Sequence, residues 1–276
     1  MICFPNAKIN LGLNITEKRP DGFHNIETVF YKVGWQDALE VVVLDSARTD
    51  NKNQSFNLHL SGIPIHGELK DNLLFKAYQL ISKFKSVPAI DVYLHKHIPM
   101  GAGLGGGSAD AAFFINLLNN QFNLKLTIDE KTTIAKTLGS DCAFFIDNTP
   151  VFAKGKGDEF TNINLDLSNY YIMVVYPNVH SNTAEAYSLV KPQQLTKSIT
   201  QILEQPISTW KEELVNDFEI SIFNKYPIVK QIKETLYANE AVYACMSGSG
   251  SAVFGIFKNK PTITELESYP YWIGTM

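Results

Sequence analysis

The sequence predicts an α+β protein with two domains, and three observations lead to this prediction. The first third of the chain has the alternation and the Val, Phe and Tyr content of strands. A run of glycines, residues 101–107, lies between a predicted strand and a predicted helix. The second half contains amphipathic segments of helical spacing near residues 182–190, 196–204, 208–216 and 227–238, followed by predicted strands at 241–246 and 251–257.

The composition is that of a globular protein with a hydrophobic core. Of 276 residues, 45% are hydrophobic and 19% are charged, which excludes a disordered chain. The net charge of −4 gives no basic surface for nucleic acid. No apolar run approaches the roughly 18 residues that cross a membrane, and the first ten residues lack the pattern of a signal peptide. Three scattered cysteines exclude a disulfide framework, so we expect a reducing, cytoplasmic setting.

The elements of the first quarter follow from their residue patterns. Strands are predicted over residues 24–33 and 38–44, which are rich in Val, Phe and Tyr. A third strand is predicted over residues 56–60, where apolar and polar residues alternate. Asp71 precedes apolar residues at helical spacing, and we expect it to cap a helix that starts at Leu73.

Two well-marked elements frame the glycine run. Residues 90–94 alternate between apolar and polar and predict a strand that leads into it. Residues 108–120 are apolar nearly all round and predict a buried helix. Residues 127–130, Thr-Ile-Asp-Glu, have the pattern of a capping box that opens a further helix, which ends at Gly139.

The glycine run predicts a binding site for phosphate. Five of the seven residues from Gly101 to Gly107 are glycine, which lets a ligand approach the backbone closely. The helix that follows presents N–H groups without intrachain partners and the positive end of its dipole. A strand, a glycine loop and a buried helix in this order therefore form an anion site, most naturally for a nucleotide.

Other glycine motifs agree less well with this segment. Residues 101–106 satisfy G-x-G-x-x-G, but Asp129, the acidic residue at about the expected 20-residue distance, lies at a helix start and not at a strand end. No Gly-Lys-Ser/Thr follows the glycines, so the segment is not a P-loop. A flexible linker is the remaining alternative, and the clear strand and helix on either side argue against it.

Five segments together resemble one enzyme family. The run from Pro99 to Ser108 resembles the second motif of the GHMP small-molecule kinases, and Met246 to Ser251 resembles their third. Leu138 to Asp141 resembles the segment that carries the family's catalytic aspartate. The triple glycine at residues 105–107 resembles, more narrowly, the branch that phosphorylates a cytidine diphosphate ester of methylerythritol, and Ala7 to Leu11 and Asp21 to His24 resemble the same branch. The segments occur in the family's order and extend from residue 7 to residue 251.

The resemblance implies a fold and a reaction. The fold would be an N-terminal ribosomal-protein-S5-like α/β domain, residues 1–152, and a C-terminal ferredoxin-like domain, residues 153–276, with a cleft between them. Turn-forming residues near 148–157 agree with that boundary. The reaction would use ATP and Mg²⁺ to phosphorylate the 2-hydroxyl of the methylerythritol moiety, in the non-mevalonate isoprenoid pathway. No nucleic acid, membrane or required protein partner is expected.

The resemblance also assigns the catalytic pair. Asp141 would be the base, since a loose phosphoryl-transfer transition state releases the alcohol proton late and needs only a weak base in the right place. If Ser140 caps a short helix, Asp141 lies at its N-terminal end, which favours the ionised carboxylate. Lys8 would keep Asp141 ionised and stabilise the transferring phosphoryl group.

The binding residues follow from the same motifs. Phe23 and Tyr187 would stack on the cytosine and His24 would bind its edge, while Asn10 and Thr183 would bind the substrate's polar arm. Asp141 also belongs to the substrate set. The ATP site would comprise Pro99, Met100, Gly101, Ala102, Gly103, Leu104, Gly105, Gly106, Gly107, Ser108 and Ala109, with Asn72 and Lys96 on the adenine side. The third glycine motif would contribute Ser247, Gly248, Ser249 and Gly250.

Some assignments stay open at this point. Ser108 could bind a phosphate oxygen or Mg²⁺. His95-Lys96-His97 has no third ligand and is interpreted as surface, and Cys142 as a packing thiol. Three other functions compete: a GHMP kinase acting on mevalonate, homoserine or a sugar; a nicotinamide-dependent enzyme; and a non-catalytic nucleotide-binding module. Retention of both Lys8 and Asp141 argues against the last.

Overall fold

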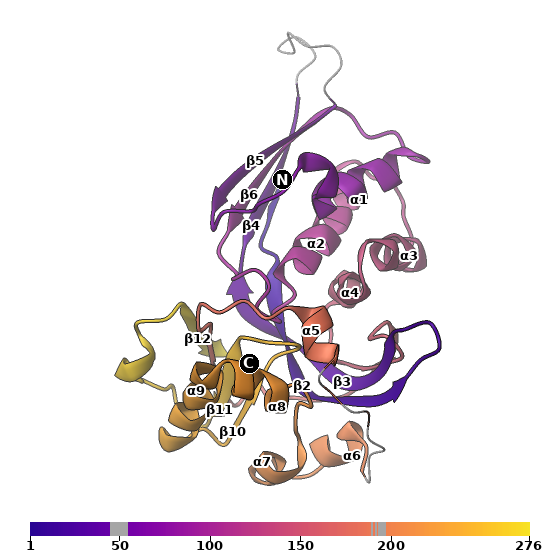
Figure 1. Ribbon diagram of the computed structural model, residues 1–276. Coiled ribbons are helices and arrows are strands. Elements are labelled where there is room, and N and C mark those ends of the chain that lie inside the picture. The colour runs from indigo at the N-terminus through magenta and orange to yellow at the C-terminus, as the bar shows by residue number, and fades with distance from the viewer. Residues whose placement is uncertain (45–54, 189, 191, 193–196) are drawn as a thin grey trace. The chain divides into compact units, whose positions relative to one another are not determined.

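The computed structural model describes residues 1–44, 55–188, 190, 192 and 197–276 (Figure 1). The chain forms two compact units, each made of separate segments. The first contains residues 1–7, 35–98 and 106–148; the second contains residues 8–34, 99–105 and 149–276. The predicted linear division after residue 152 stays a prediction, and each unit is described by itself. No helix in the described ranges is long and apolar enough to span a membrane.

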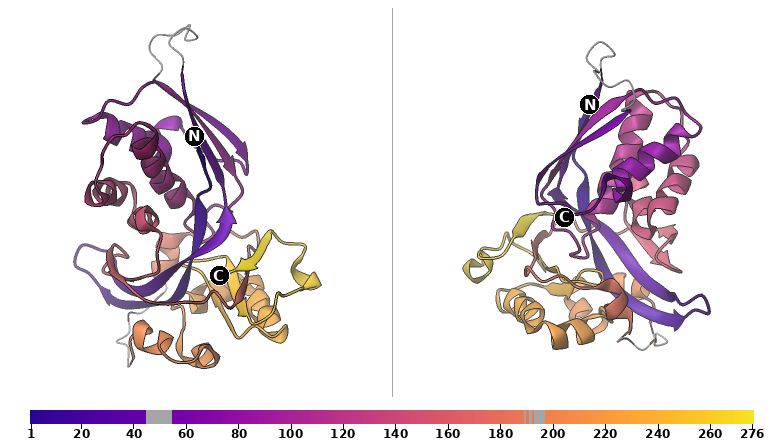
Figure 2. Two further views of the ribbon diagram at one scale, coloured as in Figure 1. Left: turned by 180° about the vertical axis from the view of Figure 1, so that it is seen from behind. Right: turned by 45° about the horizontal axis from the view of Figure 1, so that its top comes forward.

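The first unit is a sheet with helices on one face (Figures 1 and 2). The strand order is β1 (Ile2–Cys3), β4 (Ala38–Val43), β6 (Ile90–Lys96) and β5 (Phe56–Gly62), with β5 parallel to β6 and the other pairs antiparallel. Burial alternates along β6, as its sequence predicts. The covering helices are α1 (Leu73–Ser82) and α2 (Gly106–Gln121), with α3 (Ile128–Leu138) and α4 (Phe144–Asp147) packed around α2.

The helix ends agree with the sequence only in part. The capping box of α3 is confirmed, because Thr127 and Glu130 each bond the other's backbone N–H, and α3 ends at Gly139. The expectation for Asp71 is wrong: Asn72 is the N-cap of α1, and its side chain accepts the N–H of Leu74 at 2.9 Å. Asp71 instead ends the short 3₁₀ helix η1 (Leu69–Asp71).

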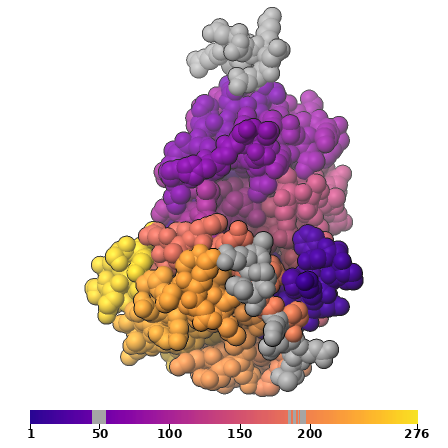
Figure 3. Space-filling view, viewed as in Figure 1, coloured from indigo at the N-terminus to yellow at the C-terminus, as the bar shows by residue number. Residues whose placement is uncertain are grey.

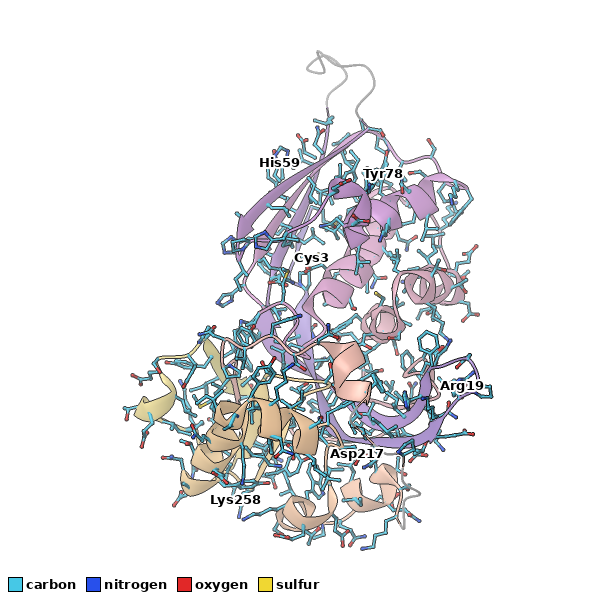
Figure 4. All side chains as sticks on the ribbon, viewed as in Figure 1. Cys3, Arg19, His59, Tyr78, Asp217 and Lys258 are labelled. Carbon is cyan, nitrogen blue, oxygen red and sulfur yellow. The ribbon has the colours of Figure 1, made fainter. Side chains whose placement is uncertain are left out.

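A long hairpin opens the second unit's first sheet. The strand order is β2 (Asn6–Lys18), β3 (His24–Gln36), β7 (Val151–Lys154) and β8 (Glu159–Asn162). The hairpin turns at residues 20–22, where Gly22 has a φ of +85° and Arg19 marks the tip in Figure 4. Asp217, also labelled there, accepts the N–H of Ile15 on β2 at 2.7 Å.

The second sheet of this unit is antiparallel throughout. Its strand order is β10 (Tyr243–Met246), β11 (Val253–Phe257), β9 (Tyr171–Val175) and β12 (Tyr271–Thr275). The helices α8 (Glu219–Lys225) and α9 (Pro227–Ala238), orange in Figure 3, pack on this sheet through a shared hydrophobic core. The helix predicted over 227–238 is confirmed residue for residue by α9.

The other predicted helices of the second half are shorter than expected. They are α5 (Thr183–Ser188), α6 (Ile199–Leu203), the 3₁₀ helix η3 (Ile207–Thr209) and α7 (Trp210–Glu213). A last 3₁₀ helix, η4 (Thr264–Leu266), precedes β12. The ends of the segments expected near 182–190 and 196–204 fall partly on residues outside the described ranges.

Candidate active site

The glycine loop, residues 99–105, joins β6 to α2 and requires its glycines. Gly101, Gly103 and Gly105 have φ values of +64°, +79° and +70°, in the left-handed region that disfavours other residues. A side chain at Gly103 would also place its Cβ 2.0 Å from the carbonyl oxygen of Ser247. The backbone conformation and this close approach together restrict position 103 to glycine.

The third glycine motif holds the glycine loop in place. The hydroxyl of Ser247 donates to the carbonyl of Gly103 at 2.8 Å, and the N–H of Ala252 donates to the carbonyl of Ala102 at 3.0 Å. The structure therefore brings together two motifs that lie about 145 residues apart in the sequence.

Lys8 and Asn10 lie against the same loop. Both side chains project from one side of β2, because residues two apart on a strand share a face. The buried ammonium of Lys8 donates to Oδ1 of Asn10 at 2.6 Å and to the carbonyl of Gly103 at 3.1 Å, and it lies 4.9 Å from the centre of the Phe30 ring. The N–H of Asn10 donates to the hydroxyl of Ser247 at 3.3 Å. The predicted catalytic lysine and both glycine motifs thus meet in the second unit.

Two of the residues predicted to bind cytosine contact each other. The ring of His24 stacks on that of Tyr187, with centroids 5.0 Å apart and planes at 18°. Phe23 is 58% exposed, and the ammonium of Lys156 lies 4.8 Å from its ring centre. Burial, with a contribution from nearby Lys18, lowers the pKa of His24, which favours the neutral imidazole with one donor and one acceptor nitrogen.

Thr183 and Ser249 extend this region of the second unit. Their hydroxyl oxygens lie 2.9 Å apart, which joins the start of α5 to the third glycine motif. Since α5 also carries Tyr187, one short helix presents two of the side chains that the resemblance assigned to substrate.

Asp141 lies in the first unit, in the 3₁₀ turn η2 (Ser140–Ala143). The expectation that Ser140 caps this turn is wrong, since Gly139 is the N-cap and the hydroxyl of Ser140 instead donates to Oδ1 of Asp141 at 3.2 Å. The next residue, Cys142, shares a side-chain hydrogen bond with Ser108 in the first turn of α2. The turn that carries Asp141 is thereby held beside the start of α2.

The cysteines carry no sign of reactivity. Burial raises the pKa of Cys142 to about 11, against the opposing effect of its hydrogen bond with Ser108. Burial likewise raises the pKa of Cys3 to about 12 and raises the pKa of Cys245. All three are free cysteines. The thiolate is the nucleophilic form, so Cys142 has the properties of a packing thiol.

The interpretation of Lys96 as a surface residue is wrong. His95 and His97 are exposed as expected, but Lys96 is 1% exposed. Its ammonium pairs with the carboxylates of Asp37 and Asp110. Since the side chain of Asn72 caps α1, both residues predicted for the adenine side already have partners in the protein, and their contact with adenine stays a prediction.

The sequence analysis missed two residues that shape the glycine motifs. The imidazole of His180 packs on Gly101 so closely that a Cβ there would lie 2.4 Å from Nδ1. The side-chain amide of Asn216, which is 2% exposed, donates to the carbonyls of Met246 and Gly248, each at 2.8 Å. The glycine-motif residues that His180 and Asn216 contact lie at least 30 positions away in the sequence, so no local pattern marks either residue.

The available ligand groups suit a nucleotide better than a resident metal. A Cβ at Gly107, in the first turn of α2, would meet no atom within 4 Å, and the first N–H groups of a helix lack intrahelical partners. Among the described residues, no group of three or more His, Cys, Asp or Glu could hold a metal ion. The hydroxyl of Ser108 is an oxygen ligand of the kind that Mg²⁺ accepts alongside phosphates.

Comparisons with known proteins match both halves of the chain to one family. Residues 72–156 match the model of the GHMP kinases N terminal domain, and residues 198–269 match that of the GHMP kinases C terminal domain. The 4-diphosphocytidyl-2-C-methyl-D-erythritol kinase of Bacteroides fragilis is 51% identical over 267 residues, 97% of this chain and 96% of that protein. The protein of the same name from Parabacteroides distasonis is 50% identical over 262 residues, 95% and 93% of the two chains.

Solved structures give the same result for the fold. A crystal structure of 4-(cytidine 5'-diphospho)-2C-methyl-D-erythritol kinase superposes with a TM-score of 0.82 at 28% identity, covering 100% of this chain and 98% of that one. A homoserine kinase from Cytophaga hutchinsonii has a TM-score of 0.67 at 14% identity, covering 99% and 95% of the two chains, which shows a common fold alone. These matches confirm the predicted α+β class with its two kinase domains.

Proposed function

Because the chain belongs to the 4-diphosphocytidyl-2-C-methyl-D-erythritol kinase family of the GHMP kinases, we propose that it transfers the γ-phosphoryl group of ATP to the 2-hydroxyl of that cytidine compound. The products would be the 2-phosphate and ADP, in the non-mevalonate route to isoprenoid precursors. The observation that carries the proposal is the carbonyl of Gly103 in the glycine loop, which accepts both the ammonium of Lys8 and the hydroxyl of Ser247 from the third glycine motif.

The phosphates of ATP are proposed to bind at the glycine loop and the start of α2. The loop's glycines allow close approach of the phosphates to the backbone. The N–H groups and the dipole of α2 favour an anion at this end of the helix. Mg²⁺ would be held by the phosphates and by Ser108. A magnesium ion in kinase sites keeps several waters and needs few protein ligands, which agrees with the donor groups found here.

Lys8 and Asp141 are proposed to carry the chemistry. Phosphoryl transfer through a loose transition state depends on positioning and on charge stabilisation. Lys8 would place its charge on the transferring phosphoryl group, held in orientation by Asn10 and the carbonyl of Gly103. Asp141 would accept the proton of the 2-hydroxyl, and its turn is fixed beside Ser108 through Cys142.

The substrate's cytosine is proposed to bind at His24 and Tyr187. A base can stack on an aromatic face, and a neutral imidazole offers both a donor and an acceptor for the base edge. Exposed Phe23 lies next to His24 and supplies a second aromatic face. Thr183 and Asn10 would bind the polar arm. A cytoplasmic location and activity without a protein partner are part of the proposal.

The test is ADP release by the purified full chain with ATP and Mg²⁺. Three alcohols are compared: 4-diphosphocytidyl-2-C-methyl-D-erythritol, mevalonate and homoserine. We expect ADP only with the cytidine compound, and ADP release slowed by orders of magnitude in the Asp141→Asn variant. Turnover of mevalonate or homoserine alone would keep a GHMP kinase and reject the cytosine site. Quenching of NADH fluorescence by the protein would favour the nicotinamide alternative, which we expect to fail.

A further inference from the structure

We propose that Asp37, Lys96 and Asp110 form a buried charged cluster that positions both ends of the glycine loop for ATP. In this role Lys96 is a positioning residue and not an adenine contact. The inference rests on the proposed function, because it requires the loop to bind a nucleotide.

The cluster is an ion-pair network inside the first unit. Lys96, the last residue of β6, pairs with Asp37 and lies 2.8 Å from Oδ2 of Asp110. The side chains of Lys96, Asp37 and Asp110 are 1%, 0% and 5% exposed. Buried charges persist only when they are paired, and removal of one partner leaves the others uncompensated. The three residues therefore fix one another's positions.

The cluster holds the segment that enters the loop. Oδ1 of Asp37 accepts the N–H of His97 at 2.6 Å and the N–H of Ile98 at 2.8 Å. His97 and Ile98 immediately precede the loop at Pro99. Hydrogen bonds from two successive N–H groups to one carboxyl oxygen set the direction of the backbone.

The same cluster holds the segment that leaves the loop. Asp110 lies in the second turn of α2, and Gly106 is its first residue. The ammonium of Lys96 packs so closely on Gly106 that a Cβ there would lie 2.8 Å from Nζ. The glycine at position 106 thus makes room for the lysine, and the lysine locates the N–H groups at the start of α2.

The charge balance supports a role beyond simple packing. Two carboxylates share one ammonium, and Oδ1 of Asp110 is a buried atom with no hydrogen-bond partner among the described residues. Burial, together with Asp37, raises the pKa of Asp110 to about 7 despite the attraction of Lys96. Replacement of a buried ion pair by apolar residues is often neutral or stabilising, so stability alone does not account for the cluster.

The cluster would act on ATP binding by preventing small displacements of the glycine loop. A misplacement of about 1 Å at a site of phosphoryl transfer can reduce the rate by about a hundredfold. Loss of Lys96 would release both ends of the loop at once. The adenine-contact alternative makes a different prediction, since an adenine contact by Lys96 would not depend on Asp110.

The experiment is a double-mutant cycle on the full chain. The affinity for a fluorescent ATP analogue, and KM and kcat for both substrates, are measured for the wild type, Lys96→Met, Asp110→Asn and the double variant. We expect Lys96→Met to weaken ATP binding by about 10- to 100-fold and to leave KM for the alcohol substrate unchanged. The double variant should bind ATP no more weakly than Lys96→Met, because the two residues act through one contact.

The matched control is Leu118→Ala, on the same helix. Leu118 is fully buried and lies 12 residues after Gly106, about 18 Å along α2. It should lower the melting temperature and leave ATP affinity unchanged. If Lys96→Met does not fold, Asp110→Asn alone, which preserves shape, should still weaken ATP binding more than Leu118→Ala does.

Three results would overturn the inference. These are unchanged ATP affinity in a folded Lys96→Met variant, additive effects of Lys96→Met and Asp110→Asn, or an equal loss of ATP affinity in Leu118→Ala. A wild-type chain that binds no ATP would instead reject the proposed function and remove the basis of the inference. The wild-type measurement therefore separates the two failures.

Discussion

The ammonium of Lys8 lies 2.6 Å from Oδ1 of Asn10, two residues further along the same strand. This contact is set by the strand itself, because β2 places both side chains on one face. The amide of Asn10 is fixed in turn by donation to the hydroxyl of Thr28 at 2.9 Å. Asn10 and the carbonyl of Gly103 thus help to orient the ammonium of Lys8.

Replacement of Lys8 by Met should reduce kcat by about 10²- to 10³-fold, because it removes a preorganised charge from the transferring phosphoryl group. Single-turnover kinetics with ATP and the cytidine substrate would measure this. The control is Lys154→Met, which removes a half-exposed lysine paired with Glu27 and should leave kcat unchanged. A similar kcat for both variants would remove Lys8 from the mechanism.

Asp141→Asn should lower kcat by about 10²- to 10⁴-fold while both substrates still bind, since the amide keeps the shape of the carboxylate and cannot accept the proton. Calorimetric titration of ATP and of the cytidine compound would check binding separately from turnover. Asp129→Asn, at an exposed position in the first turn of α3, is the control. Unchanged turnover in Asp141→Asn would exclude Asp141 as the base.

Tyr187→Ala should weaken binding of the cytidine substrate by about tenfold, because a base loses an aromatic face. The measurement is KM for each substrate. Tyr93 stacks on His59 in the same manner, with centroids 4.5 Å apart and planes at 14°, but on the exposed face of β6. Tyr93→Ala is therefore the matched control and should change neither KM. An effect of Tyr187→Ala on ATP alone would contradict the cytosine assignment.

A comparison of Gly103→Ala with Gly22→Ala separates the effect of a close contact with neighbouring atoms from the effect of backbone strain. Both glycines have a positive φ, +79° and +85°, so alanine at either costs about 1–2 kcal/mol of stability. Gly22 has open space around it, whereas a Cβ at Gly103 would overlap the carbonyl of Ser247. Gly103→Ala should therefore lose more stability and also lose ATP affinity. Equal melting temperatures for the two variants would contradict the close contact at Gly103.

The raised pKa of Asp110 gives stability a defined dependence on pH. Below its unfolded value of about 3.9 the carboxyl is protonated in both states, and its contribution is complete. Between that value and about 7 the folded state binds the proton more tightly, so stability falls as the pH rises. Asp110→Asn should flatten this part of the profile. Thermal unfolding of both proteins from pH 5 to pH 8 measures the difference, and parallel profiles would contradict it.

The sequence predicts elements whose determinants are local. The capping box of Thr127 and Glu130 and the apolar spacing of α9 both lie within one helix, so their patterns were sufficient. The full length of β2 could not be predicted in this way, because ten successive residues are buried and several of them are polar. Such a strand shows no alternation between apolar and polar residues.

The candidate site was predictable where a motif defines it and not where distant residues do. The glycine loop, Lys8 and Asn10 follow from short segments, and the structure brings them together. Lys96 was misplaced because its partners, Asp37 and Asp110, are 59 and 14 residues away. The contact between His24 and Tyr187 was not predicted, because the two rings are 163 residues apart in the sequence and no local pattern marks the pair.

The raised pKa values of the three cysteines have a practical consequence for spectroscopy. Alkylating dyes react with the thiolate, and a solvent-exposed cysteine of ordinary pKa carries more than about a hundredfold more thiolate near pH 8 than Cys142 does. A cysteine introduced at exposed Lys156, beside Phe23, would therefore take up a fluorophore selectively in the otherwise natural chain. The label would report directly on the arrival of an aromatic base at that end of the hairpin.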